Sequence, residues 1–250
     1  MGWLGKILGG SLGYLVGGPI GAVAGAALGH GFDAAADLQR SGTGSAAEPL
    51  TAHESQQAAF FVSTFSMLGK LAKADGVVSR EEVAAVEAFM RNNLGLPPQA
   101  RRLAIRIFDE AKSSPVEFED YARQFYGLFH GRPEMLYSMV ELLTTVALAD
   151  GVFHPEEQRL IAAAAEIFGV EYEQVRRART DDADRYYAVL GASREDSMTE
   201  IKKKYRALAQ EYHPDRIISK GLPEEFVKFA NQKFQEIQEA YEKIKAERGA

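Results

Sequence analysis

The sequence predicts an all-α protein in three parts: an N-terminal transmembrane helix, a helical bundle and a C-terminal helical hairpin. Apolar residues recur at helical spacing, strand-like alternation does not occur between residues 52 and 179, and capping residues separate the apolar runs. The boundaries that we predict are residues 1–38 for the membrane segment, 39–52 for a linker, 53–180 for the bundle and 181–250 for the hairpin.

The N-terminal segment has the length and composition of a membrane span. No formal charge lies between Lys6 and Asp33, and the apolar stretch at residues 7–29 measures about 34 Å as a helix. A hydrocarbon core is about 30 Å thick, so this stretch is long enough to cross it. Its glycines recur at every fourth position, a spacing that lets two helix backbones approach closely in lipid. The glycines that we expect at a homodimer contact are Gly13, Gly17, Gly21 and Gly25.

Two other interpretations of this segment stay open. Lys6 and the apolar run also fit a signal peptide with a cleavage site near residues 22–26, and a soluble glycine-rich leader is the second alternative. The charges around the stretch, with Lys6 before it and Asp33 and Asp37 after it, weakly favour an N-terminus inside the cell. The small and polar residues 39–52 predict a flexible linker.

In the bundle, capping residues divide the chain into helices. Ser79 with Glu82 forms a capping box, and prolines stand at the first positions of several later helices. The helices that we predict span residues 54–72, 79–93, 98–112, 115–129, 133–148, 155–168 and 171–179.

An acidic segment occurs twice in the bundle, at residues 74–82 and again at residues 149–157. Each copy follows one apolar helix and precedes the next, which predicts a repeated helix-turn-helix unit. The candidate metal ligands are Asp75, Glu82, Asp150 and Glu157. The second half of each copy matches an EF-hand loop, but lysine and apolar residues hold the earlier ligand positions. In the alternative, structural interpretation, the aspartates cap turns and the glutamates complement helix N-termini.

The C-terminal segment predicts two antiparallel helices joined by a turn. Ser197 and Glu200 form a capping box that starts the first helix. Its apolar face carries Ile201, Tyr205, Leu208 and Tyr212. The second helix, at about residues 225–246, has a matching apolar stripe, so the two helices form a hairpin.

The tripeptide His213-Pro214-Asp215 lies between these two helices. Because proline disfavours helix at the residue before it, the first helix must end near Tyr212. The proline ring then holds the tripeptide in one exposed conformation. The alternative is a plain helix stop, in which His213 complements the helix dipole and Asp215 makes a turn.

Composition excludes several classes of function. The net charge of −6 argues against nucleic acid as a partner, because phosphate binding needs a basic surface. The chain has no cysteine, which excludes disulfides, thiol nucleophiles and thiolate metal sites. Nucleotide-binding and hydrolase motifs are also missing from the sequence, so we expect neither an enzyme nor a cofactor.

Three segments resemble known families. The two acidic copies in an all-helical segment resemble the TerB-like fold, a helical bundle. The stretches YYAVLG, IKKKYRALAQEYHPD and FQEIQEAYEKIK closely resemble the J domain of DnaJ-type co-chaperones. With a start similar to WxGKILG and a glycine zipper that ends in LGHGFD, the whole chain resembles the DjlA family of membrane-anchored bacterial J proteins.

The resemblance implies a non-enzymatic co-chaperone that recruits a DnaK-type chaperone and stimulates its ATP hydrolysis. It assigns the stimulating role to His213, Pro214 and Asp215. The cations that it implies for docking are Lys202, Lys203, Arg206 and Arg216, where Arg216 stands in place of a common lysine. The Gly/Phe-rich region and the zinc module of general DnaJ proteins are missing from the sequence.

Because that partner uses ATP, the resemblance places residues 39–250 in the cytoplasm, against the charge bias. The chain is then expected in the bacterial inner membrane, with one span and as a homodimer. The alternative is a metal-binding or stress-sensing TerB-like adaptor, with the J domain as its output.

Overall fold

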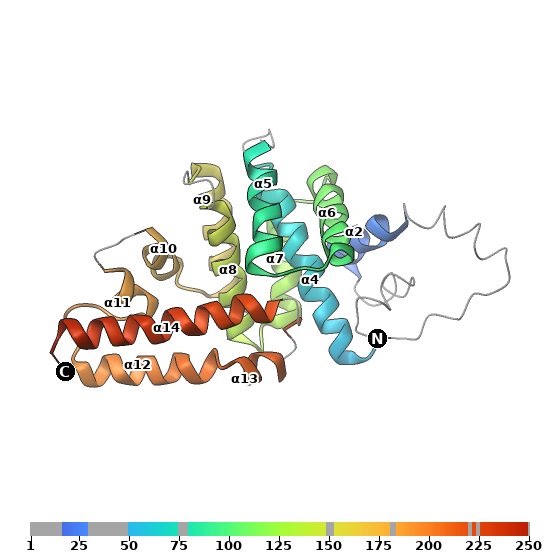
Figure 1. Cartoon of the computed structure of the whole chain (residues 1–250). Coiled ribbons are helices and arrows are strands. Elements are labelled where there is room, and N and C mark those ends of the chain that lie inside the picture. The colour runs from blue at the N-terminus through green and yellow to red at the C-terminus, as the bar shows by residue number, and fades with distance from the viewer. Residues whose placement is uncertain are drawn as a thin grey trace.

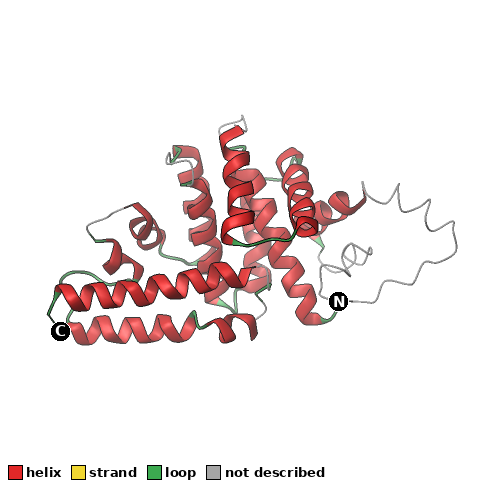
Figure 2. Cartoon of the chain, viewed as in Figure 1, coloured by secondary structure: helices red, strands yellow, loops and turns green. Residues whose placement is uncertain are grey.

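The computed structural model describes residues 17–29, 50–74, 80–148, 153–180, 184–219, 222–223 and 226–249. All regular structure in these ranges is helical, which confirms the all-α prediction (Figures 1 and 2). The helices are α2 (Gly18–Gly29), α4 (Ala52–Leu71), α5 (Arg80–Ala88), the π-helical turn η2 (Phe89–Asn93), α6 (Pro98–Ser113), α7 (Phe118–Phe129), α8 (Pro133–Ala147), α9 (Pro155–Phe168), α10 (Tyr172–Thr180), α11 (Arg185–Val189), α12 (Met198–Glu211), α13 (Pro214–Ser219) and α14 (Val227–Glu247).

The bundle is built around α4, which is buried along most of its length. Thr51 and Glu54 form a capping box at its start. From there α4 packs against α6, α7 and α8. The Phe60 ring meets the rings of Phe125 and Phe129 edge-on, at centroid distances of 5.7 and 5.9 Å. A helix that is apolar on nearly all sides belongs at the centre of a bundle, and α4 lies there.

One predicted helix start in the bundle was wrong. The helix expected at residues 115–129 begins three residues later, at Phe118. Ser114 is extended, and its hydroxyl accepts a hydrogen bond from the Val116 N–H at 3.2 Å, which closes a local side-chain turn. This local turn competes with the first helical turn, so residues 114–117 stay outside α7.

The C-terminal hairpin consists of α12 and α14, which lie side by side in Figure 1. The rings of Tyr205 and Tyr241 stack between them, with centroids 4.2 Å apart and planes inclined by 12°. The short helix α11 packs against α14. The described hairpin residues therefore follow the arrangement that the two apolar stripes predict.

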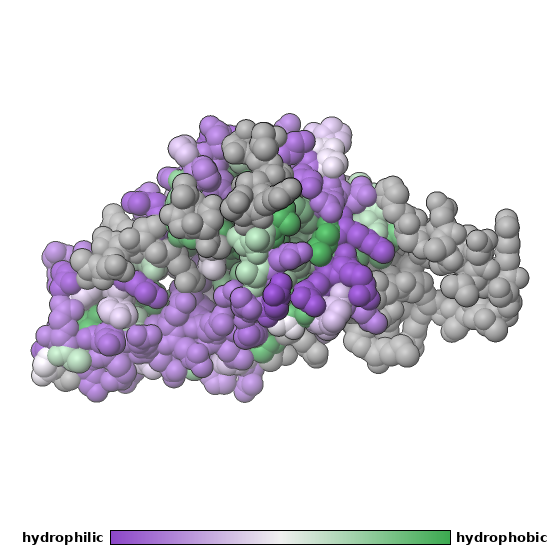
Figure 3. Space-filling model, turned by 45° about the horizontal axis from the view of Figure 1, so that its top comes forward, coloured by the Kyte–Doolittle hydropathy of each residue, from purple (hydrophilic) through white to green (hydrophobic). Residues whose placement is uncertain are grey.

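The hairpin and the bundle share one hydrophobic core. Phe226, just before α14, is fully buried and meets Phe60 and Phe61 edge-on at 4.9 and 6.2 Å. Phe229 meets Phe89 of η2 at 6.1 Å. In the view of Figure 3 the coloured surface is mostly hydrophilic, with smaller hydrophobic areas near its centre.

Helix α2 is docked on the bundle, against α4, α6 and α7. Its buried face consists of Ile20, Val23, Ala24 and Ala27. The Gln124 side chain of α7 accepts a hydrogen bond from the Ile20 N–H at 2.8 Å and donates one to the Gly17 carbonyl oxygen. This amide therefore satisfies backbone groups at the start of α2, where helices lack internal partners.

Two glycines of the predicted stripe lie away from this docked face: a Cβ on Gly17 or Gly25 would meet nothing within 4 Å. Gly13, like residues 1–16 and the linker residues 39–49, falls outside the described part. Within the described ranges no helix has both the length and the apolar character of a membrane span. A span over residues 7–29 would include all of α2, so the docked and spanning arrangements exclude each other.

Candidate functional site

The tripeptide at residues 213–215 forms an exposed turn at the end of α12. The Tyr212 N–H makes the last hydrogen bond of that helix, to Leu208, and Pro214 starts the short helix α13. The His213 carbonyl oxygen accepts a hydrogen bond from the Arg216 N–H at 2.9 Å. Because proline is suited to a first helical position, it both ends α12 and begins α13. Helix α13 was not predicted from the sequence.

The side chains of the turn differ in exposure. The Asp215 side chain is 91% exposed, while that of His213 is 53% exposed and lies 3.9 Å from the Asp215 carboxylate through Nδ1. The His213 ring meets the Phe234 ring of α14 at 5.7 Å, with the planes inclined by 72°. The turn therefore offers an exposed carboxylate and an imidazole that is held on one side by α14.

Exposed cations lie on α12, away from the core. Lys202, Lys203 and Arg206 are exposed, whereas Ile201 beside them is fully buried. Arg216 of α13 is exposed as well. None of these four cations forms an ion pair within the described ranges, so their charges are available to an anionic surface.

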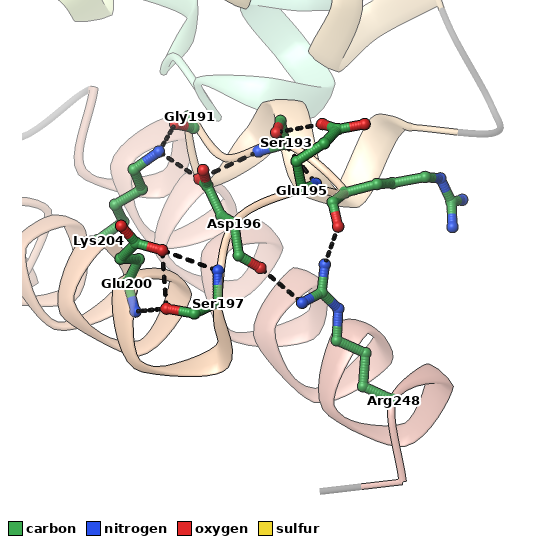
Figure 4. A network of polar contacts seen from close by, with 9 residues as sticks. Gly191, Ser193, Glu195, Asp196, Ser197, Glu200, Lys204 and Arg248 are labelled. Atoms are coloured by element: carbon green, nitrogen blue, oxygen red, sulfur yellow. Dashed lines mark hydrogen bonds and ion pairs between the residues drawn. The ribbon is translucent and has the colours of Figure 1, made fainter.

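Lys204, in the same basic run, has a structural role that the sequence did not reveal (Figure 4). Its ammonium donates to the Asp196 carboxylate at 2.6 Å and to the Gly191 carbonyl oxygen at 2.7 Å. The hydrogen bond from Lys204 holds the pKa of Asp196 below its usual range. Lys204 points into the loop before α12, while Lys202, Lys203 and Arg206 are exposed.

Two further contacts fix the start of α12 (Figure 4). Ser197 and Glu200 form the predicted capping box, and the hydrogen bond from Ser197 lowers the Glu200 pKa. Arg248, beyond the end of α14, donates to the carbonyl oxygens of Asp196 and Arg194 at 2.6 and 2.7 Å. These hydrogen bonds join the loop between α11 and α12 to the C-terminal end of α14, which holds α12 in place.

Tyr212, directly before the turn, is buried against α8. Its ring meets the Tyr137 ring at 6.1 Å, and Tyr212 and Ser138 line the same small cavity. Burial, reinforced by the Glu141 carboxylate, raises the pKa of the Tyr212 phenol well above its usual range. The sequence placed Tyr212 on the apolar face of α12 but did not indicate its contact with the bundle.

Lys233 of α14 forms a buried ion pair with Glu141 of α8. The Lys233 ammonium donates to the Glu141 carboxylate, and the two side chains are 3% and 0% exposed. The Glu236 carboxylate lies 3.7 Å from the same ammonium, and the Tyr137 ring centre lies 6.0 Å from it. Spacing alone could not reveal this pair, because its members are 92 positions apart in the chain.

Family comparisons cover the whole chain. Residues 1–46 match the family model of the co-chaperone DjlA transmembrane domain, residues 61–180 that of the tellurite resistance protein TerB, and residues 185–248 that of the DnaJ domain. Co-chaperone DjlA proteins of Aliivibrio fischeri and Vibrio cholerae are each 36% identical to the chain, over 98% of both sequences. The co-chaperone DjlA of Escherichia coli is 31% identical over 89% of both.

The chain belongs to the DjlA family of co-chaperones. Its order of TerB and DnaJ segments after a DjlA transmembrane segment confirms the predicted resemblance. Membership supports a regulatory, non-enzymatic co-chaperone role. No solved structure matches the chain.

Of the four candidate metal ligands in this DjlA-family chain, the structure describes the side chain of Glu157. Asp75, Asp150 and the Glu82 side chain lie outside the described residues. Glu157 is buried, and its carboxylate accepts a hydrogen bond from the His154 N–H at 3.3 Å, as the structural interpretation expects. Among the described residues no group of three or more histidines and carboxylates is placed to hold a metal ion.

Proposed function

We propose that this chain is a membrane-anchored co-chaperone that recruits a DnaK-type chaperone and stimulates its ATP hydrolysis. The observation that carries the proposal is the exposed turn at residues 213–215, which follows directly on a helix with unpaired cations. Asp215 can accept a charge-assisted hydrogen bond from an arginine of the ATPase. The His213 side chain is the second group of this contact, and Pro214 fixes the backbone between His213 and Asp215.

In this proposal, Lys202, Lys203, Arg206 and Arg216 attract an acidic surface of the ATPase. Opposite charges across an interface raise the association rate and set the orientation of docking. Because these cations are exposed, added salt screens them. Docking should therefore weaken as ionic strength rises, whereas the buried contacts around Tyr212 should change little.

The membrane part of the proposal rests on the match of residues 1–46 to the DjlA transmembrane domain. We place the span at residues 7–29, in the inner membrane, so that α2 leaves its position against α4, α6 and α7 when it spans the bilayer. The remainder of the chain then lies in the cytoplasm, where ATP is available to the partner. Self-association through Gly13, Gly17, Gly21 and Gly25 stays a prediction.

The test is single-turnover ATP hydrolysis by a DnaK-type chaperone, with the full chain in detergent micelles. Wild-type protein should accelerate hydrolysis, and His213→Gln should abolish the acceleration. His130→Gln is the matched control, because it makes the same change at an exposed histidine on the bundle. Equal stimulation by wild type and His213→Gln would refute the proposed mechanism.

A further inference from the structure

Helix α8 of the bundle contacts the hairpin on both sides of the stimulating turn. Tyr212 precedes the turn and packs on the Tyr137 ring, whose centroid lies 6.1 Å from its own. Lys233 lies in the helix that follows it and pairs with Glu141. One face of α8 therefore touches both chain segments that lead into and away from residues 213–215.

The path from α8 to His213 is short and runs through neighbouring residues of α14. Lys233 points into the bundle, to Glu141, while Phe234, the next residue, meets the His213 ring at 5.7 Å. Successive helical residues point about 100° apart, so fixing the direction of Lys233 also fixes the direction of Phe234. The Glu141 contact thus sets the surface on which the imidazole rests.

Burial makes this contact strongly directional. A buried ammonium needs a partner in good geometry, because it has given up its hydration shell. Lys233 is 3% exposed and Glu141 is fully buried, so rotation of α14 about its axis would separate the charges inside the core. On the other side, Tyr212 is nearly fully buried, which limits movement of the end of α12.

We infer that Glu141 and Tyr137 of the TerB segment are positioning residues for the His213-Pro214-Asp215 turn, acting through Lys233 and Tyr212. This inference rests on the proposed function. A turn that is held in its active shape before docking loses less conformational entropy when the ATPase binds. The TerB segment then helps to set how effectively the J domain stimulates its partner.

Docking and stimulation should respond differently to a change at Glu141. The cations of α12 lie on an exposed face and do not contact α8 or Lys233 in the described contacts. A change at Glu141 should therefore lower the maximal stimulated rate and leave the co-chaperone concentration for half-maximal stimulation nearly unchanged. General unfolding would lower both docking and stimulation.

The test measures stimulated ATP hydrolysis against the concentration of the full chain in detergent micelles. Glu141→Gln keeps the side-chain shape but removes the charge that pairs with Lys233. Its maximal rate should fall about threefold or more, a fold-change within the range of coupling free energies between residues in contact. Glu134→Gln is the matched control, since it changes another buried glutamate of α8 and should keep the wild-type rate.

Two further variants cover the case in which Glu141→Gln does not fold. The double variant Glu141→Gln with Lys233→Gln replaces the ion pair by a neutral hydrogen-bonded pair and should recover at least part of the rate. Tyr137→Leu removes the ring that packs on Tyr212, and it should lower the maximal rate by a smaller factor. Circular dichroism identifies the folded variants.

A local readout complements the rates. The Arg216 amide donates to the His213 carbonyl oxygen, so its hydrogen exchange reports on the closed turn. This exchange should accelerate in Glu141→Gln, while amides in the middle of α4 keep their protection.

The possible failures are distinguishable. Suppose that wild type stimulates, that His213→Gln does not, and that the folded variants at both α8 contacts match wild type. The positioning role is then refuted while the proposed function stands. If wild type gives no stimulation, the proposed function itself fails.

Discussion

Gly69 of α4 lies against the backbone carbonyl oxygen of Phe108 in α6, so closely that a Cβ atom on residue 69 would overlap that oxygen. The atom in the way is backbone and cannot turn aside as a flexible side chain would. The two helices pack at their observed distance because residue 69 has no side chain.

Gly69→Ala should therefore destabilise the protein by about 1–3 kcal/mol, the usual cost of inserting a methyl group into a packed core. Urea denaturation followed by circular dichroism measures the free energy of unfolding. Gly127→Ala is the control: it also lies in a helix, but nothing lies within 4 Å of an added Cβ there. Removing a helical glycine should stabilise by about 0.5–1 kcal/mol. Equal effects of the two substitutions would contradict the close approach of α4 and α6.

Asp196 should make stability depend on pH in the acid range. The hydrogen bond from Lys204 lowers its pKa in the folded state. Its contribution is therefore fully present above the unfolded value, near 3.9, and is lost as pH falls through the folded value. Thermal unfolding from pH 3 to pH 6 should show a shallower loss of stability in Asp196→Asn than in wild type. Asp109→Asn, another surface aspartate paired with a lysine, provides the comparison.

Phe226→Ala should weaken the junction between bundle and hairpin. The side chain is fully buried among Phe60 and Phe61, and replacing such a phenylalanine by alanine costs about 3–5 kcal/mol through lost burial and the cavity left behind. Leu128→Ala, at a 43% exposed position, should change stability by no more than about 0.5 kcal/mol. Calorimetry would also show whether the variant unfolds in two steps; a single unchanged transition would argue against the shared core.

The local parts of this fold could be predicted from short stretches of sequence. Ser197 and Glu200 start α12 as expected, because both partners of a capping box lie within one turn. The wrong helix start at Ser114 also has a local cause. Its hydroxyl can accept a hydrogen bond in a turn or in a helix cap, and in this structure it accepts one in a turn. The exposed tripeptide was found from the same kind of short-range signal.

The contacts between the two halves could not be predicted in this way. Tyr212 and Phe226 each belong to apolar stripes of the hairpin, and periodicity says that a stripe is buried without saying against what. A lysine such as Lys233 in an otherwise charged helix is also expected in solvent, because lysines are rarely buried without a partner. Only the fold brings Glu141 close enough to be that partner.

The shared core also has a consequence for fragments of the chain. The matches to TerB and DnaJ divide the sequence between residues 180 and 185, yet the apolar faces of Phe226 and Phe229 meet their partners on the far side of that division. A fragment cut there would carry these rings, or the surface they cover, into water, where exposed apolar patches promote aggregation. Solubility of either half would thus depend on the presence of the other.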